Sequence, residues 1–253
     1  MTVHLILLDT SFQGALLGLA RGEQSSWTLD TVSFYENPQE AATALPRMLQ
    51  ELMAKGGLSL EQIDGVVIGV GPGSFTGIKI GLSFAYGLKK ACPRLELTGV
   101  SALRALSRHQ AHGGLSVLPA TATAGYFASR ELDVRMLGIV RGPEVSSSKL
   151  SAGDATWELF EKTEQDSDRD SGRKPWPQSV NVIGVWPRLE EFLTARGIAF
   201  QNWPVTSLGE PLLQGMLADY VESSHSALDK QRLPQALYLR RSAPEEKLAP
   251  SSP

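Results

Sequence analysis

The sequence contains a single cysteine, Cys92, among its 253 residues. One cysteine cannot form a disulfide within the chain, and no group of cysteines and histidines has the spacing of a zinc site. We therefore expect a cytoplasmic protein. The chain also has little excess charge of either sign: it contains 24 Lys and Arg and 27 Asp and Glu, which gives a formal net charge of −3. This balance argues against a protein that grips nucleic acid alone through phosphate contacts.

Long apolar runs are missing as well. No stretch approaches the roughly 18 apolar residues that a membrane-spanning helix needs, so we expect no membrane partner. The apolar start Val3–Leu8 ends at Asp9 and has no basic segment before it. A buried first strand explains this pattern better than a signal peptide. With 42% hydrophobic residues, the chain is able to bury the core of one large domain or two small ones.

The order of the expected elements predicts an α/β fold. Apolar runs at Val3–Leu8, Ala15–Ala20 and Trp27–Val32 predict an antiparallel meander, with a turn at Arg21–Gln24. Asn37-Pro38 is a helix-start signal for a helix that Gly56-Gly57 ends. Strands and helices then alternate: we expect strands at 65–70 and 95–100, one helix that follows the segment 71–77 and ends at about Ala91, and another after Ser101. This alternation indicates a mixed sheet flanked by helices.

The second half predicts a second lobe. Two or three strands are expected within 115–139 and one at 180–185, with helices at 187–196 and 211–223. The mixed-charge run 161–174 is typical of a solvated loop. We therefore expect an N-terminal lobe at 1–110, a C-terminal lobe at 111–242 with an exposed insertion at about 142–179, and a flexible tail at 243–253.

A glycine-rich segment lies between the strand at 65–70 and the next helix. Backbone N–H groups at such a helix start can bind an anion, and a carboxylate after the first strand can hold a cation–phosphate complex. The candidate residues for a phosphate-type site are Asp9, Thr10, Ser11, Gly71, Gly73, Ser74 and Thr76. Lys79 follows Ile78 rather than a glycine, so the segment is not a Walker A loop, and it also fails Gly-x-Gly-x-x-Gly. A tight structural turn is the alternative interpretation.

Small residues recur every four positions at Gly73, Gly77, Gly81 and Ala85. Each glycine inside a helix costs about 0.8–1 kcal/mol relative to alanine, so something must approach this helix face closely. Packing on the protein's own sheet is one explanation. Association with a helix of another subunit is the other.

Catalytic and metal-ligating residues are hard to find. The segments 81–85 and 99–103 each lack the second glycine of a Gly-x-Ser-x-Gly nucleophile elbow. His109 and His112 are three residues apart, but no acidic third ligand lies nearby. We expect no catalytic residue and no metal site.

Three segments together resemble the TsaB family, also called YeaZ. They are Leu7–Ser11, Gly71–Leu82 and Gly99–Leu103, of which the second is close to the family signature. Tyr238–Arg241 resembles the family's C-terminal ending. The resemblance covers mainly the first 110 residues.

The resemblance implies an actin/Hsp70-like (ribonuclease H-like) fold with a second, degenerate or reduced lobe. It implies a non-catalytic scaffold or activator subunit required for threonylcarbamoylation of the adenosine 3′ of the anticodon, in tRNAs that read codons starting with adenine. The catalytic partner would be the paralogue TsaD, with the ATPase TsaE in a larger complex and TsaC supplying threonylcarbamoyl-adenylate. ATP and magnesium would be bound in the partner complex and not tightly by this chain. The chain would contact tRNA only as part of the complex.

The partner surface implied by the resemblance is the glycine-striped helix together with the helix from Pro38 to Lys55. A homodimer through the same helices is a further expectation. The residues expected at this interface are Met48, Leu52, Gly77, Gly81, Leu82 and Ala85.

The sequence departs from the family after the strand at 115–118. The family usually has an Asp-Ala-Arg-like segment there, whereas this chain reads Pro119-Ala120-Thr121 and lacks the acidic residue. Alanine cannot coordinate a cation, which argues against nucleotide hydrolysis by this chain alone. The alternative function is an enzyme on the same fold, either phosphotransferase-like or peptidase-like, for which no second glycine-rich loop and no nucleophile–base pair is recognisable.

Overall fold

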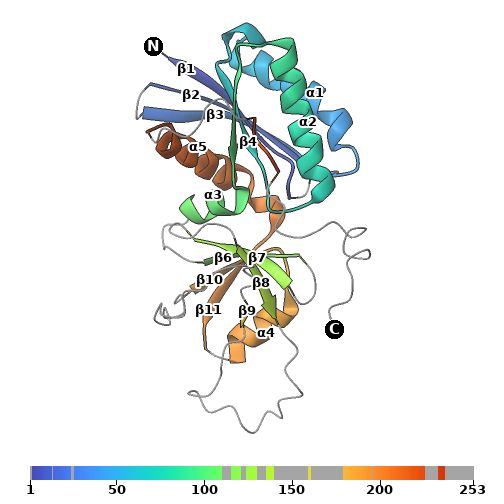
Figure 1. The fold of residues 1–253 in the computed structure, drawn as a ribbon, viewed down its shortest axis with the longest axis vertical. Helices are drawn as coiled ribbons and strands as arrows, with labels where there is room; N and C mark the ends of the chain where they lie inside the picture. The colour runs from blue at the N-terminus through green and yellow to red at the C-terminus, as the bar shows by residue number, and fades with distance from the viewer. Residues whose placement is uncertain are drawn as a thin grey trace.

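The chain forms two mixed β-sheets with helices against them, as the computed structural model shows (Figure 1). The structure describes residues 2–12, 14–23, 26–109, 115–120, 124–129, 135–139, 159–160, 179–195, 197–225 and 233–236. The expected insertion at 142–179, apart from residues 159–160 and Ser179, and the expected tail at 243–253 lie outside these residues. No helix in the described ranges combines the length and apolar character needed to cross a bilayer.

The first sheet has the strand order β3-β2-β1-β4-β5. Its strands are β1 (Val3–Asp9), β2 (Ala15–Glu23), β3 (Ser26–Tyr35), β4 (Gly65–Gly69) and β5 (Glu96–Val100). The first three form an antiparallel meander, and β4 and β5 run parallel to β1. The predicted mixed sheet flanked by helices is confirmed. The turn expected at Arg21–Gln24 is wrong in part, because β2 continues through Glu23 and Arg21 Nε pairs with Asp30 at 3.1 Å across the hairpin.

Both faces of this sheet are covered by helices (Figure 1). α1 (Ala41–Gly56) and α2 (Phe75–Ala91) lie on one face, and α3 (Ala102–His109) and α5 (Gly209–His225) lie on the other. Successive residues of β1 point to opposite faces, so Ile6 and Leu8 pack under α1 and α2 while Leu5 and Leu7 pack under α3 and α5. This explains the continuous apolar run of the first strand.

The start of α1 differs from the prediction. The helix begins at Ala41 with Glu40 in the capping position, and Asn37 is not its cap. The Asn37 side chain instead accepts a hydrogen bond from the Gln39 backbone N–H at 3.1 Å, which stabilises a turn before the helix. The predicted end is confirmed, because Gly57 has a φ of 65°, a left-handed conformation that glycine adopts without strain.

The second sheet repeats the topology of the first. Its strands are β6 (Leu115–Pro119), β7 (Ala124–Ala128), β8 (Arg135–Ile139), β9 (Leu159–Phe160), β10 (Ser179–Ile183) and β11 (Ala199–Trp203), in the order β11-β10-β6-β7-β8-β9. β6 to β8 form an antiparallel meander, and β10 and β11 run parallel to β6, with α4 (Pro187–Ala195) between them. The sequence showed no internal repeat, and β11 was not predicted.

The last helix returns to the first sheet. α3 follows β5, α5 follows β11, and these two helices pack against each other and against the first sheet. Arg108 on α3 forms ion pairs with Asp219 and with Glu222 on α5. Residues 209–225 fall within the range expected for the C-terminal lobe, yet α5 contributes to the core of the first sheet.

Candidate functional site

The candidate site is built around Asp9, the last residue of β1. Its side chain is buried, with 3% of the residue exposed. The Ser11 hydroxyl donates to Asp9 Oδ2 at 2.9 Å, and the Ser11 backbone N–H donates to Oδ1 at 3.0 Å. Asp9 and Ser11 thus form hydrogen bonds with each other within the turn that follows the strand.

Burial changes the acidity of this carboxyl group. Loss of solvent raises the pKa of Asp9 from 3.8 to about 6, because the charged form is disfavoured in an apolar surrounding. The hydrogen bonds from Ser11 and from the Phe12 backbone oppose this rise, since they stabilise the carboxylate. Among the residues that the structure describes, no lysine or arginine forms an ion pair with Asp9.

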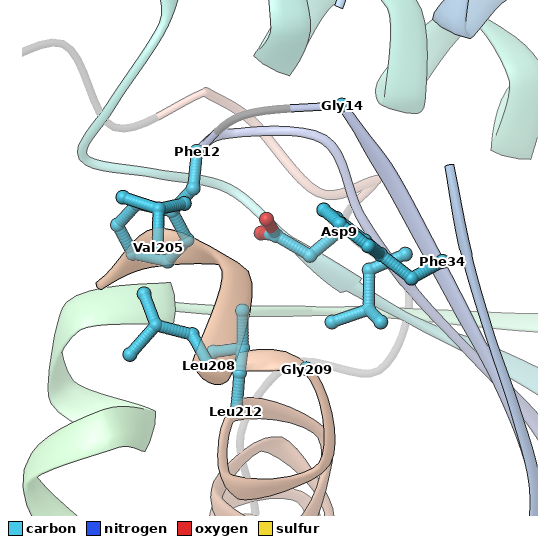
Figure 2. Close-up of a pocket in the computed structure, with 9 residues that line it drawn as sticks. Asp9, Phe12, Gly14, Phe34, Val205, Leu208, Gly209 and Leu212 are labelled. Carbon is cyan, nitrogen blue, oxygen red and sulfur yellow. The ribbon is translucent and has the colours of Figure 1, made fainter. Parts of the chain in front are cut away.

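A cavity of about 20 Å³ lies beside Asp9, which is room for about one water molecule. Figure 2 shows the Asp9 carboxylate pointing toward the side of the cavity where Phe12 and Val205 lie. Val205 belongs to the short helix η2 (Val205–Ser207), and the start of α5 completes the wall with Leu208 and Gly209. Residues that follow the second sheet therefore cover the carboxylate, and a nucleotide phosphate does not fit beside it.

Two glycines allow the backbone to pass close to this turn. A Cβ atom at Gly69 would lie 1.9 Å from Asp9 Oδ2, and one at Gly73 would lie 2.1 Å from the Ser11 carbonyl oxygen. Both distances are far below contact distance. Gly71 has a φ of 100°, which side chains rarely allow, so both candidate glycines, Gly71 and Gly73, have a structural reason. This favours the tight-turn interpretation over an anion cradle.

Two backbone N–H groups at the start of α2 have partners within the chain. The Ser74 N–H donates to the Ser11 carbonyl at 2.6 Å, and the Gly77 N–H donates to the Ser74 hydroxyl at 3.1 Å. Gly71 and Pro72 are buried and Ser74 and Thr76 are exposed. The Gly71 carbonyl accepts from the N–H of Ala102, which joins the loop to α3. The candidate residues Asp9, Ser11, Gly73 and Ser74 are thus brought together, but they bind one another.

The glycine stripe on α2 faces inward. A Cβ at Gly77 would lie 1.9 Å from the Thr10 carbonyl oxygen, and one at Gly81 would lie 2.4 Å from Thr10 Oγ1. The Thr10 hydroxyl donates to the Gly77 carbonyl at 2.7 Å, so the end of β1 is held directly against the helix. Close approach of a backbone was correctly predicted, but the approaching segment belongs to this chain.

The residues expected at a partner interface therefore need correction. Gly81 is buried, Gly77 is half-buried, and the others lie in the core that α1 and α2 form on the first sheet: Met48, Leu52, Leu82 and Ala85. Their apolar character is explained by internal packing. The outward positions of α2 are instead Phe75, Thr76, Lys79, Ser83, Gly87 and Lys90.

The second sheet lacks the acidic group at the corresponding place. β6 occupies in its sheet the position that β1 occupies in the first, and β6 ends at Pro119, followed by Ala120. Within the described residues no three Asp, Glu, His or Cys side chains gather to hold a metal ion. The Ser101 hydroxyl accepts from the N–H of Arg104 at 3.3 Å, as a helix cap. His112 lies outside the described residues.

Several residues of the site were missed by sequence reasoning. Phe12, Val205 and Leu208 cover Asp9, and Gly69 makes room for it. Gly69 carried a signal, because a glycine ends an otherwise branched-apolar strand. Val205 and Leu208 carried none, since they lie almost 200 positions further along the chain.

Comparison with known proteins adds the family context. A family described as TsaD, tRNA N6-adenosine threonylcarbamoyltransferase, matches residues 38–124. The chain is 31% identical over 129 residues to the tRNA threonylcarbamoyladenosine biosynthesis protein TsaB of Haemophilus influenzae, covering 49% of this chain and 52% of that protein. It is also 31% identical over 108 residues to TsaB of Escherichia coli, covering 42% and 43%. The matched region spans about half the length of these relatives.

Solved structures show the same fold along most of the chain. A Pseudomonas aeruginosa protein described as similar to peptidase YEAZ aligns with a TM-score of 0.59 at 20% identity, over 94% of this chain and all of that one. YeaZ from Pseudomonas aeruginosa aligns with a TM-score of 0.54 at 19% identity, with the same coverage. The predicted resemblance to the TsaB/YeaZ family is confirmed.

Proposed function

We propose that this chain is a non-catalytic subunit required for threonylcarbamoylation of tRNA adenosine, and that it acts by binding a catalytic TsaD-type partner. The similarity to TsaB proteins over 129 residues supports the pathway. The TsaD-type match over 38–124 supports a partner with a related fold.

One observation carries the non-catalytic role. Asp9, the only acidic residue of the candidate loops, is covered by Phe12, Val205 and Leu208, and the adjacent cavity of about 20 Å³ has room for one water molecule. The loops at 9–11 and 71–76 are vestigial phosphate-type loops in this proposal. ATP and magnesium, together with the TsaE-type ATPase, belong to the partner complex.

The outward face of α2, together with α1, is the proposed partner surface. Thr76, Lys79, Ser83 and Gly87 are exposed and follow one another at helical spacing. A Cβ at Gly87 would meet no atom within 4 Å, so the fold of this chain does not explain a glycine there. A mid-helix glycine without an internal reason suits a helix of another subunit that packs closely.

The experiment uses two substitutions at Gly87. Gly87→Ala adds one methyl group and should leave the complex intact, whereas Gly87→Leu should abolish sedimentation with a TsaD homologue while the chain stays folded. If Gly87→Leu left the complex unchanged, the partner surface would have to lie elsewhere on the chain. Absence of any complex with the unsubstituted chain at micromolar concentration would contradict the function itself.

The pathway is tested separately in cells. Depletion of the protein should remove threonylcarbamoyladenosine from tRNA, as measured by mass spectrometry of nucleosides, and re-expression should restore it. An undiminished level after verified depletion would contradict the proposal. Calorimetric titration of the isolated chain with ATP and magnesium tests the enzyme alternative, for which tight binding would be the supporting result.

A further inference from the structure

The segment Leu233–Ala236, which follows α5 in the chain, lies against the first sheet. Its residues belong to neither a helix nor a strand. Pro234 is buried, and Ala236 packs half-buried against the core under α1 and α2. Leu233 is 53% exposed and Gln235 is exposed as well. Two of the four side chains therefore hold this segment in place.

Residues of α2 and β5 contact Pro234. The Tyr86 hydroxyl on α2 donates a hydrogen bond to the Pro234 carbonyl. On β5, a Cβ at Gly99 would lie 2.9 Å from Pro234 Cβ and 2.8 Å from Val70 Cγ1. Both distances are too short for a real side chain, so Pro234 can lie at this position only because residue 99 is glycine.

These contacts lie at the edge of the first sheet. Among the described strands, β5 is the last in the order β3-β2-β1-β4-β5. Gly99 pairs with Ile68, which belongs to the core under α1 and α2, so Pro234 lies on that face of β5. α5 packs on the opposite face. The chain therefore encloses the edge strand from both faces, and the open edge of a sheet is where a further strand can add.

Few contacts anchor this segment. One hydrogen bond, one buried proline and one half-buried alanine hold it, whereas α2 beneath it is fixed by a row of buried side chains that includes Ile78, Leu82 and Ala85. Segments with few buried apolar contacts open locally at a much smaller free energy than global unfolding requires. We therefore expect Leu233–Ala236 to leave its position while α2 and the sheet stay folded.

We propose that Leu233–Ala236 is a strap that opens as one unit while the first sheet stays folded. In the docked state the strap contacts Gly99 and binds the Tyr86 hydroxyl. In the open state these groups and Val70 are free at the edge of the sheet, and Tyr86 is next to Gly87 of the outward face of α2. The strap thus controls access to this edge. The inference does not depend on the proposed function.

Thiol labelling of the full chain measures the opening. Cys92→Ser removes the single native thiol, and Ala236→Cys places a reporter where the side chain packs against the core. The labelling rate with an aromatic disulfide reagent should stay nearly constant in urea below the unfolding transition, because opening four residues exposes little surface. A rate that rises with urea in parallel with global unfolding would overturn the proposal. So would a rate in the folded protein equal to that of the urea-unfolded chain.

A substitution then assigns the protection to the contact with α2. Tyr86→Phe removes the hydrogen bond to Pro234 and should raise the labelling rate roughly three- to tenfold, the change expected for the loss of one hydrogen bond. Tyr35→Phe is the matched control, because it removes a tyrosine hydroxyl that bonds to Glu40 instead, and it should leave the rate unchanged. Thermal unfolding of each variant checks that it is folded. An unchanged rate in folded Tyr86→Phe, or an equal rise in Tyr35→Phe, would overturn the proposal.

Discussion

Gly69 and Asp9 lie so close that a methyl group at position 69 would come within 1.9 Å of Asp9 Oδ2. The two residues end neighbouring parallel strands, and β4 can pass beside the carboxylate only because it ends in glycine. This close approach leaves the carboxylate buried beneath Phe12 and η2.

Gly69→Ala should therefore destabilise the protein markedly. Because both partners are buried, we expect a loss of roughly 2–4 kcal/mol in the free energy of unfolding, measured by denaturant titration. Asp9→Ala in the same chain should recover part of the loss, since the clash is with the carboxylate. A loss below about 0.5 kcal/mol for Gly69→Ala, the size of an ordinary surface change, would contradict this packing.

Asp9 should make stability depend on pH. Its pKa is about 6 in the folded protein against 3.8 as the ordinary value, so the folded state holds a proton that the unfolded state has lost. The stability that this group contributes is complete below pH 3.8 and is lost as the pH rises through about 6. At 1.36 kcal/mol per pKa unit the loss is about 3 kcal/mol.

Asp9→Asn removes this titration and still offers Ser11 an oxygen acceptor. We expect the variant to be more stable than the unsubstituted protein at pH 7.5, by up to about 3 kcal/mol, and of similar stability near pH 4. Denaturant titrations across this pH range measure the difference. If the difference in free energy of unfolding between the two proteins did not change with pH, Asp9 would have an ordinary pKa.

Gly81→Ala and Gly87→Ala should act in opposite directions although both residues lie on α2. At Gly81 the new Cβ would lie 2.4 Å from Thr10 Oγ1, so we expect a loss of about 1–3 kcal/mol. At Gly87 the Cβ meets no atom within 4 Å, so better helix propensity should stabilise by about 0.8–1 kcal/mol. Thermal unfolding of the two variants side by side tests the inward orientation of Gly81, and equal effects would contradict it.

The ion pair between α3 and α5 should be essential for stability. Asp219 is 5% exposed and the Arg108 side chain 7%, and desolvation raises the pKa of Asp219 while the charges of Arg108 and Arg104 lower it. Asp219→Asn leaves a buried guanidinium with less compensation, so we expect a loss of about 3–5 kcal/mol in denaturant titration.

Glu222→Gln is the control for this ion pair. The Glu222 side chain is 56% exposed, and its contact with Arg108 should contribute at most about 1 kcal/mol. If the two variants were equally stable, the buried position of Asp219 between the helices would be wrong.

The sequence by itself determined most of the first sheet and its helices. The runs at Val3–Leu8 and Gly65–Val70 were apolar enough to predict buried strands, and Gly57 and Ser101 marked helix boundaries, because these signals depend only on neighbouring residues. It also carried the family resemblance, which lies in contiguous segments. The start of α1 was misplaced because Asn37 stabilises a local turn instead of capping the helix.

Only the tertiary structure decided what the glycines and apolar helix positions do. A helical stripe such as Gly77 and Gly81 indicates close approach but does not identify the approaching segment, and here Thr10 of the same chain occupies the space. The cover over Asp9 comes from Val205 and Leu208, which lie almost 200 positions further along the chain. Contacts between residues so distant in sequence leave no local pattern, because they depend on how two sheets and α5 pack together.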